Sequence, residues 1–235
     1  MEGMIFFLIV GLIVVGILIY YLLKNLKKYN LISKTETTPI SMVYNGFYEV
    51  KGQIVSQGLS ITSPFTETEC VYYQFTVEQK KSHGKSSHWV KIIDDEKFVK
   101  FGVNDNSGTA IVDMQGADVQ IKTDNNARSG FFNSADDREK AVLQKYSESN
   151  KNWIFEKSLR YTEKYLQIGD ELYILGEING KEGMNPLFRK SNMPLFVSDK
   201  SENELLGFYR LRIIGAVVGI LAIAALCGWL YISLN

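Results

Sequence analysis

The chain has 235 residues, and its 26 Lys and Arg balance 26 Asp and Glu, so the formal net charge is zero. A chain without excess positive charge has no overall field that draws it to nucleic acid, and we expect no nucleic-acid partner. Two Cys and two His exclude a disulfide scaffold and a multi-cysteine zinc module within this sequence. We therefore expect neither a metal ion nor a cofactor.

Two uncharged segments, residues 4–23 and 213–234, are each long enough to cross a bilayer as a helix of about 30 Å. The sequence thus predicts an integral membrane protein with two spans, for which the lipid bilayer is the first partner. The N-terminal segment lacks a basic start and a small-residue cleavage site, so we expect an anchor and not a signal peptide. Neither span holds an acidic, basic or histidine side chain, which argues against a transporter subunit with an ion pathway.

The basic residues beside the spans predict the sidedness of the protein. They lie on the flanks that face the middle of the chain, at Lys24, Lys27, Lys28, Arg210 and Arg212. The outer ends carry only Glu2 and Asn235. Because cytoplasmic flanks are enriched in Lys and Arg, we expect the middle of the chain on the cytoplasmic side of a prokaryotic membrane, with an organelle membrane as the alternative.

The spans divide the chain into three parts. We expect an anchor with its basic flank over residues 1–28, a β-rich domain over 29–206 and a C-terminal transmembrane helix over 207–235. In the second span, Gly215 and Gly219 form a G-x-x-x-G pattern, at which another helix could approach closely. A homo-oligomer through these glycines is one interpretation, and a chance occurrence of the pattern is the other.

The middle of the chain has the period-two hydrophobicity of β-strands. Over residues 47–55, Tyr48, Val50 and Ile54 share one face and polar residues share the other. Residues 70–78 alternate more cleanly. Four side chains share one face of this strand, and we expect them to be buried in a single core: Val71, Tyr73, Phe75 and Val77. Further strands are expected at 88–94, 97–103, 109–113, 117–122, 158–165, 171–178 and near 194–198.

This spacing of short strands predicts a mainly β domain, either a small barrel or a sandwich. One principal helix is expected from about residue 135 to residue 148, because Ser134 can cap it and an acidic first turn follows. Residues 35–41 and 122–130 are expected to be linkers or loops.

Four residues are the candidates for binding a partner. Asp105, Ser107 and Gly108 lie in a sequence typical of a tight turn between two strands, which is the plainer interpretation. Glu163 shares a strand face with Leu159 and aromatic residues, and a buried carboxylate needs hydrogen-bond partners. A structural hydrogen bond to a loop, surface exposure and catalysis are the three interpretations of Glu163.

Other motifs point to ordinary structure. Gly84, Lys85 and Ser86 match only the end of a phosphate-binding loop, and a solvated hairpin loop explains them better. His83 and His88 could form a metal site with Cys70, but no fourth ligand suggests itself and we expect solvated histidines. No Ser-His-Asp or Cys-His arrangement for catalysis is visible.

Several segments together resemble the GIDE-type domain, also called the "beside a membrane" (BAM) domain. The segments are Gly52 with its strand, Leu59 and Pro64 running into 69–73, Phe101 through Val112, Tyr161 through Gly169-Asp170, 173–177, and Pro194 with the run to Ser198. Together they span most of residues 45–200, and both apolar spans also fit the family. The resemblance is to the short prokaryotic-like form of a family that includes a mitochondrial membrane E3 ubiquitin ligase.

The resemblance implies a β-rich domain held against a bilayer that binds a ligand or a protein. In the ligase of this family, catalysis belongs to a zinc-binding RING after the second span, for which we expect no room after Asn235. We therefore expect a membrane-tethered, non-catalytic scaffold that binds a membrane or membrane-associated partner. The alternatives are an E3 ubiquitin ligase-like protein or another enzyme built around Glu163 or Cys70.

Overall fold

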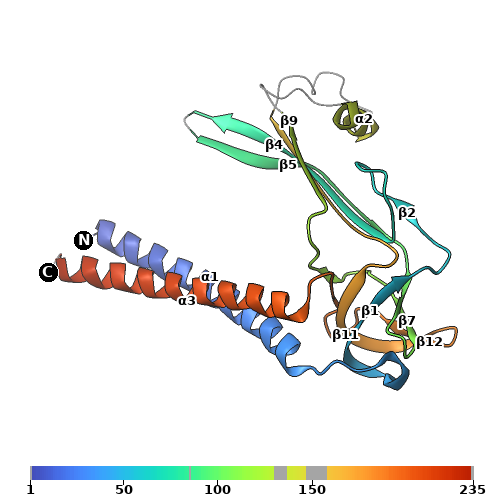
Figure 1. Cartoon of the computed structure of the whole chain (residues 1–235). Coiled ribbons are helices and arrows are strands. Elements are labelled where there is room, and N and C mark those ends of the chain that lie inside the picture. The colour runs from blue at the N-terminus through green and yellow to red at the C-terminus, as the bar shows by residue number, and fades with distance from the viewer. Residues whose placement is uncertain (1, 85, 130–136, 147–157, 234–235) are drawn as a thin grey trace. The chain divides into compact units, whose positions relative to one another are not determined.

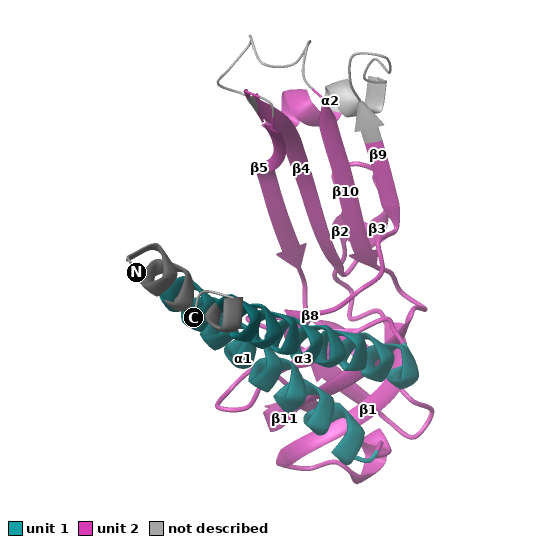
Figure 2. Cartoon of the chain, turned by 90° about the vertical axis from the view of Figure 1, so that its left-hand side faces the viewer, with its two compact units in different colours: residues 1–36, 201–235 teal, residues 37–200 magenta. Residues whose placement is uncertain are grey.

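The computed structural model describes residues 2–84, 86–129, 137–146 and 158–233. The chain forms two compact units, coloured separately in Figure 2: residues 1–36 with 201–235, and residues 37–200. The expected division at residues 28 and 206 stays a prediction, because packing of the chain does not locate a membrane boundary.

The first unit is a pair of long helices, α1 (Glu2–Lys34) and α3 (Glu202–Ser233). They run antiparallel and side by side, with the start of α1 beside the end of α3 (Figures 1 and 2). The most apolar 18 residues of Ile9–Lys34 and of Glu202–Leu230 have mean hydropathies of 2.2 and 2.5, and both stretches are long enough to cross a membrane. Two apolar helices therefore flank the β domain in sequence, as predicted.

Glycine allows the two helices to approach. A Cβ atom on Gly219 would lie 3.3 Å from the Leu18 side chain of α1, whereas one on Gly215 would meet nothing within 4 Å. Gly219 thus contacts the other helix of the same chain. A homo-oligomer through these glycines stays a prediction.

A closed five-stranded barrel forms one part of the second unit. Its strands are β1 (Gly46–Val55), β6 (Phe101–Asn104), β7 (Thr109–Val112), β12 (Asn185–Phe188) and β11 (Glu171–Glu182), which pair in that order before β11 closes on β1. The β7–β12 pair is parallel and the other four are antiparallel. On the edge of β11 that also carries β12, two short strands extend the sheet: β13 (Phe196–Ser198) and β8 (Asp118–Val119).

Two glycines of the barrel strands allow other parts of the chain to approach closely. A Cβ atom on Gly52 of β1 would lie 2.5 Å from the backbone oxygen of Asn104, and one on Gly176 of β11 would lie 2.7 Å from the Leu195 side chain. At Gly52 the neighbouring atom is backbone, so only glycine fits there, whereas a larger residue at Gly176 would require the Leu195 side chain to move. Both residues belong to the segments that carry the family resemblance.

A four-stranded sheet forms the other part of the second unit (Figure 2). In order, its strands are β5 (Ser86–Phe98), β4 (Tyr72–His83), β10 (Leu159–Leu166) and β9 (Asn125–Ser129). The first two lie between β1 and β6 in sequence, and the last two lie between β7 and β11. Two insertions into the barrel thus build one sheet. A small hairpin of β2 (Ile61–Thr62) and β3 (Glu69–Cys70) precedes β4.

The second unit has two hydrophobic cores, whereas the sequence predicts one core for the 70–78 face. Val71 lies in the barrel core with Ile54, while Tyr73, Phe75 and Val77 lie in a second core beneath the four-stranded sheet. All four side chains are buried as predicted, with Phe75 fully inaccessible. The single-core prediction is wrong, because the chain passes from the barrel into the sheet at residue 71.

Helix α2 (Asp137–Tyr146) covers the second core with Val142, Leu143 and Tyr146, which confirms one helix inside the β domain. Its expected cap, Ser134, lies outside the described residues. The Tyr146 hydroxyl donates a short hydrogen bond to Asp95 of β5, and the Tyr73 hydroxyl donates to the same carboxylate at 3.0 Å.

Some predicted boundaries were wrong for physical reasons. Two strands were predicted at 88–94 and 97–103, whereas the structure has β5, which continues to Phe98, and the short β6. Strand β5 is longer than predicted because it pairs with β4 along its whole length, with a bulge at Ile92. The predicted strand at 117–122 shrinks to β8. The predicted loop at 122–130 contains β9, a polar edge strand whose sequence has no apolar alternation. The sequence also misses β12, where Pro186 hides the pattern.

The predicted linker at 35–41 is ordered against the barrel. Thr37 forms a β-bridge with Glu49, and a 3-10 helix, η1, covers Ile40–Met42.

Candidate functional site

An open groove of about 520 Å³ lies on the barrel. Its walls come from three places: the chain after β1, the approach to β6 with β7, and the turn between β11 and β12. The lining residues are Gln57, Leu59, Lys100, Ile111, Glu182, Gly183 and Asn185. In the OB-fold, a five-stranded barrel, oligonucleotides and oligosaccharides bind across the second and third strands and between the loops that follow the first and fourth strands. The groove lies on the corresponding strands and loops of this barrel.

An ion pair crosses the polar part of the groove. The Lys100 ammonium lies 2.7 Å from a Glu182 carboxylate oxygen, and both side chains are about half exposed. The hydrogen bond to Glu182 raises the pKa of Lys100. The two charges cancel, so the groove presents no net charge to a ligand.

The shape of the groove depends on two glycines. A Cβ atom on Gly102 of β6 would lie 2.7 Å from the Gln57 amide nitrogen, so Gly102 lets Gln57 lie across the strand. Gly183 has a φ of +62°, which glycine adopts without strain, and it forms the β11–β12 turn. Beside it, Met184 is 92% exposed. The groove therefore combines the side-chain amides of Gln57 and Asn185 with Leu59 and Ile111, and Met184 is exposed next to it in sequence.

The predicted binding residues Asp105 and Ser107 connect the β6–β7 turn to η1 by hydrogen bonds. One Asp105 oxygen accepts hydrogen bonds from the Ser107 amide at 2.8 Å and the Gly108 amide at 3.0 Å, and the other accepts from the Ile40 amide at 2.7 Å. The Ser107 hydroxyl accepts from the Ser41 amide. Burial opposes ionisation of Asp105, but these donors outweigh it and lower its pKa.

Glu163 of β10 is buried and holds a loop in place. Its Oε1 accepts from the Phe65 amide at 2.8 Å, and its Oε2 accepts from the amide and the hydroxyl of Thr66 at 3.1 and 2.6 Å. The interpretation of Glu163 as a structural hydrogen-bond acceptor is confirmed. Its role in binding a partner stays a prediction, as do those of Asp105, Ser107 and Gly108, and the structure does not bring Glu163 into the groove.

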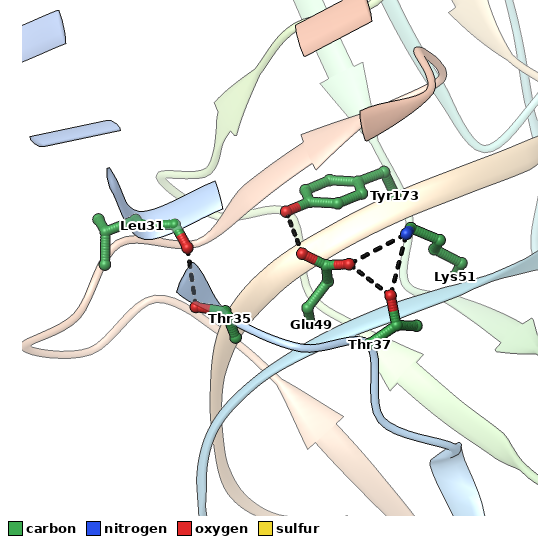
Figure 3. Close-up of polar contacts among 6 residues, drawn as sticks. All are labelled: Leu31, Thr35, Thr37, Glu49, Lys51 and Tyr173. Atoms are coloured by element: carbon green, nitrogen blue, oxygen red, sulfur yellow. Dashed lines mark hydrogen bonds and ion pairs between the residues drawn. The ribbon is translucent and has the colours of Figure 1, made fainter. Parts of the chain in front are cut away.

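A second buried carboxylate was missed. The alternation of residues 47–55 places Glu49 on the polar face, yet it is fully buried. As Figure 3 shows, Glu49 accepts from the Thr37 hydroxyl at 2.6 Å and the Tyr173 hydroxyl at 2.5 Å, and Lys51 lies 3.1 Å away. The sequence shows only that Glu49 and Lys51 share one strand face. The residues that bury Glu49, Thr37 and Tyr173, come from other parts of the chain and are known only from the tertiary structure.

Cys70 is buried next to Glu163. Its thiol points to the Ile61 carbonyl at 3.5 Å, and burial with the nearby Glu163 charge raises the pKa of Cys70 to about 12. His88 is exposed on β5, and the His83 side chain lies outside the described residues. Among the residues that the structure describes, no group of three or more His, Cys, Asp or Glu could hold a metal ion.

Comparison with protein families gives a match to the GIDE family, described as E3 ubiquitin ligase, over residues 72–229. This match spans more than half of the chain. The chain belongs to the GIDE family. Comparison with curated proteins and with solved structures gives no match. The matched segment of this GIDE chain begins at β4 and runs into α3, so β1 and the first helix lie before it. The groove residues Lys100, Ile111, Glu182, Gly183 and Asn185 all lie within the match.

Proposed function

We propose that this GIDE protein is a non-catalytic scaffold, anchored in a membrane by α1 and α3, whose barrel groove binds a protein partner. The groove carries the proposal, because it is open and lies where barrels of this size bind extended ligands. The two apolar helices support the membrane anchoring, in keeping with a family that is membrane-associated. A domain tethered at both ends has a raised effective concentration toward partners in the same membrane.

The lining favours a peptide segment as the ligand. Surfaces that bind single-stranded nucleic acid combine excess positive charge with aromatic rings for base stacking. This groove has neither, since its charges are one Lys and one Glu and its apolar residues are Leu59 and Ile111. Amide side chains beside aliphatic ones suit the backbone and side chains of an extended peptide.

The buried carboxylates favour binding over catalysis. Glu49 and Glu163 are engaged in hydrogen bonds within the fold, and Cys70 is a buried, protonated thiol at neutral pH. A nucleophile needs an exposed, activated group.

Site-specific photocrosslinking in membranes tests the groove. A photoreactive amino acid replaces Asn185, and the crosslinked proteins are identified with and without the substitution Leu59→Arg. We expect a crosslink that Leu59→Arg abolishes. The matched control is Ile168→Arg, at an exposed isoleucine outside the groove, and it should leave the crosslink unchanged. A crosslink that persists with Leu59→Arg contradicts binding in the groove.

The family description favours ubiquitin ligation as the second candidate. A RING needs two four-ligand zinc sites, whereas the sequence has two Cys and two His. We expect no stoichiometric zinc by elemental analysis and no ubiquitin transfer with purified activating and conjugating enzymes. Self-ubiquitination that disappears when Cys70 is replaced would establish the ligase instead.

We also propose that the β domain faces the cytoplasm of a prokaryotic cell, as the basic flanks predict.

A further inference from the structure

The helix pair brings together basic residues that are separate in sequence. Three contacts define the register of α1 against α3: Gly11 with Cys227, Leu18 with Gly219, and Lys28 with Tyr209. In each pair the two residue numbers add up to 237 or 238, which is the pattern of antiparallel helices in constant register. The same register puts Arg210 level with Lys27, and Arg212 level with Asn25, directly beside Lys24.

The result is a belt of five basic residues at one level of the helix pair, which we call the basic belt: Lys24, Lys27, Lys28, Arg210 and Arg212. The side chains of all but Lys28 are exposed. Lys24, Lys27 and Arg210 form no ion pair within the described part of the chain. The nearest acidic residue of α3, Glu204, lies about 9 Å along the axis from Arg210 and accepts hydrogen bonds from Ser201.

Aromatic contacts orient part of the belt. The Lys28 ammonium lies 5.7 Å from the centre of the buried Tyr209 ring, and the Arg212 guanidinium lies 4.0 Å from the centre of the Phe208 ring. Both distances are within the range of cation–π contacts. These contacts place the Lys28 and Arg212 cations beside aromatic rings of α3.

The level of the belt matches that of lipid headgroups. The uncharged run of α1 ends immediately before Lys24, and that of α3 begins immediately after Arg212. Where apolar segments end, a bilayer presents its phosphates. Clusters of four to eight Lys and Arg beside a span attract anionic lipids, and each contributes about fivefold to the affinity.

We propose that the basic belt binds the phosphate of an anionic phospholipid, with Lys27 and Arg210 as its central donors. This proposal rests on the part of the proposed function in which α1 and α3 span the membrane. Lipid bound here contacts both helices at once and so stabilises their pairing at the end that leads into the β domain.

Native mass spectrometry of the full chain in detergent tests the proposal. The probes are dioleoyl phosphatidylglycerol and dioleoyl phosphatidylcholine, which share their acyl chains and differ in headgroup charge. We expect phosphatidylglycerol to bind at least tenfold more tightly. The double variant Lys27→Gln/Arg210→Gln should bind phosphatidylglycerol about 30-fold more weakly, since two cations are lost.

Two matched variants show whether the position of the charge matters. Lys80→Gln/Arg189→Gln removes one Lys and one Arg from exposed sites on the β domain and should leave lipid binding unchanged. Lys27→Arg/Arg210→Lys keeps both charges and should retain the preference. Equal binding of the two lipids, or the same loss in the β-domain variant, would overturn the proposal. So would displacement of the lipid by millimolar glycerol 1-phosphate, which would assign the belt to free phosphate.

A separate measurement isolates the membrane anchoring. Co-flotation with phosphatidylcholine vesicles after carbonate washing needs the two spans but no anionic lipid. A chain that floats without preferring phosphatidylglycerol refutes only the lipid site, whereas a chain that does not float refutes the spanning helices.

Discussion

Glu163 illustrates how one buried carboxylate positions a loop distant in sequence. If its function is to accept the amides of Phe65 and Thr66, Glu163→Ala should destabilise the protein more than Glu163→Gln. Alanine leaves the buried Phe65 amide unpaired at a cost of about 1–3 kcal/mol, whereas glutamine keeps an acceptor oxygen. Thermal unfolding in detergent measures both variants.

Glu171→Ala is the matched control for Glu163, since Glu171 is a strand glutamate with an exposed side chain. It should leave the midpoint of unfolding nearly unchanged. Equal midpoints for the two Glu163 variants would show that the hydrogen bonds contribute little.

The thiol of Cys70 should be unreactive in the folded protein. With a pKa of about 12, far fewer than one thiol in a thousand is ionised at pH 8, against roughly a quarter of exposed thiols. In a Cys227→Ala background we expect negligible reaction with a disulfide reagent at pH 8 until denaturant is added. A cysteine at exposed Ser82, with Cys70 also replaced, should react within seconds to minutes and serves as the control.

The raised pKa of Cys70 also determines how the stability of the folded protein changes with pH. The folded pKa of Cys70 is above its unfolded value of about 8.5. The neutral thiol therefore contributes its full stability below pH 8.5, and that contribution is lost as the pH rises toward 12. Fast labelling of Cys70 at pH 8 in native protein would contradict both the burial and the shift.

At the scale of elements, the second core depends on the packing of aromatic rings. Phe75 of β4 lies between Phe65 and Tyr146, with ring centres 6.0 and 5.8 Å away. Phe75→Ala should lower the free energy of unfolding by about 3–5 kcal/mol, since the ring is fully buried.

Phe98→Ala provides the comparison, because this phenylalanine at the end of β5 is 37% exposed. Chemical denaturation followed by near-ultraviolet circular dichroism should show a clearly smaller loss for Phe98→Ala. Similar losses for the two variants would contradict the tight packing of the second core.

The strands that the sequence predicts best are those with one buried face. Tyr73, Phe75 and Val77 alternate with partly exposed residues, so their period of two is visible in the sequence. Strand β9 pairs through its backbone with β10 but has a polar sequence, and Pro186 masks β12. Backbone pairing at a sheet edge leaves no hydrophobic pattern in β9. Strand β12 pairs on both sides within the barrel, but it is short and its proline interrupts the pattern, so neither strand could be predicted.

The candidate groove could not be predicted either, because its residues come from segments up to 128 positions apart, from Gln57 to Asn185. None of them stands out in the sequence. By contrast, local turn chemistry was sufficient to predict the hydrogen-bonded turn at Asp105.

For the whole molecule, the location of the basic belt predicts which side of the membrane the β domain occupies. We replace Cys70 and Cys227 with Ala and introduce a cysteine at Ser82. In intact cells, a membrane-impermeant maleimide should leave it unlabelled, and labelling should appear after lysis, because Lys and Arg flanks remain cytoplasmic.

A cysteine at Glu2, in the same cysteine-free background, is expected on the opposite side and should be labelled in intact cells. The reverse pattern at the two positions would place the β domain outside the cytoplasm, and partners would then be sought in the envelope.

The closure of the barrel also has a consequence for synthesis. Strand β1 leaves the ribosome early, but its long partner is β11, where Gly46 pairs with Ile178 and Gln53 pairs with Glu171. The two insertions must emerge in between, and pairings so distant in sequence form slowly. Until residue 178 is available, the nascent chain keeps one edge of β1 open, and an open edge is a template for another strand. A chain that stops before β11 is therefore expected to pair with its neighbours and aggregate.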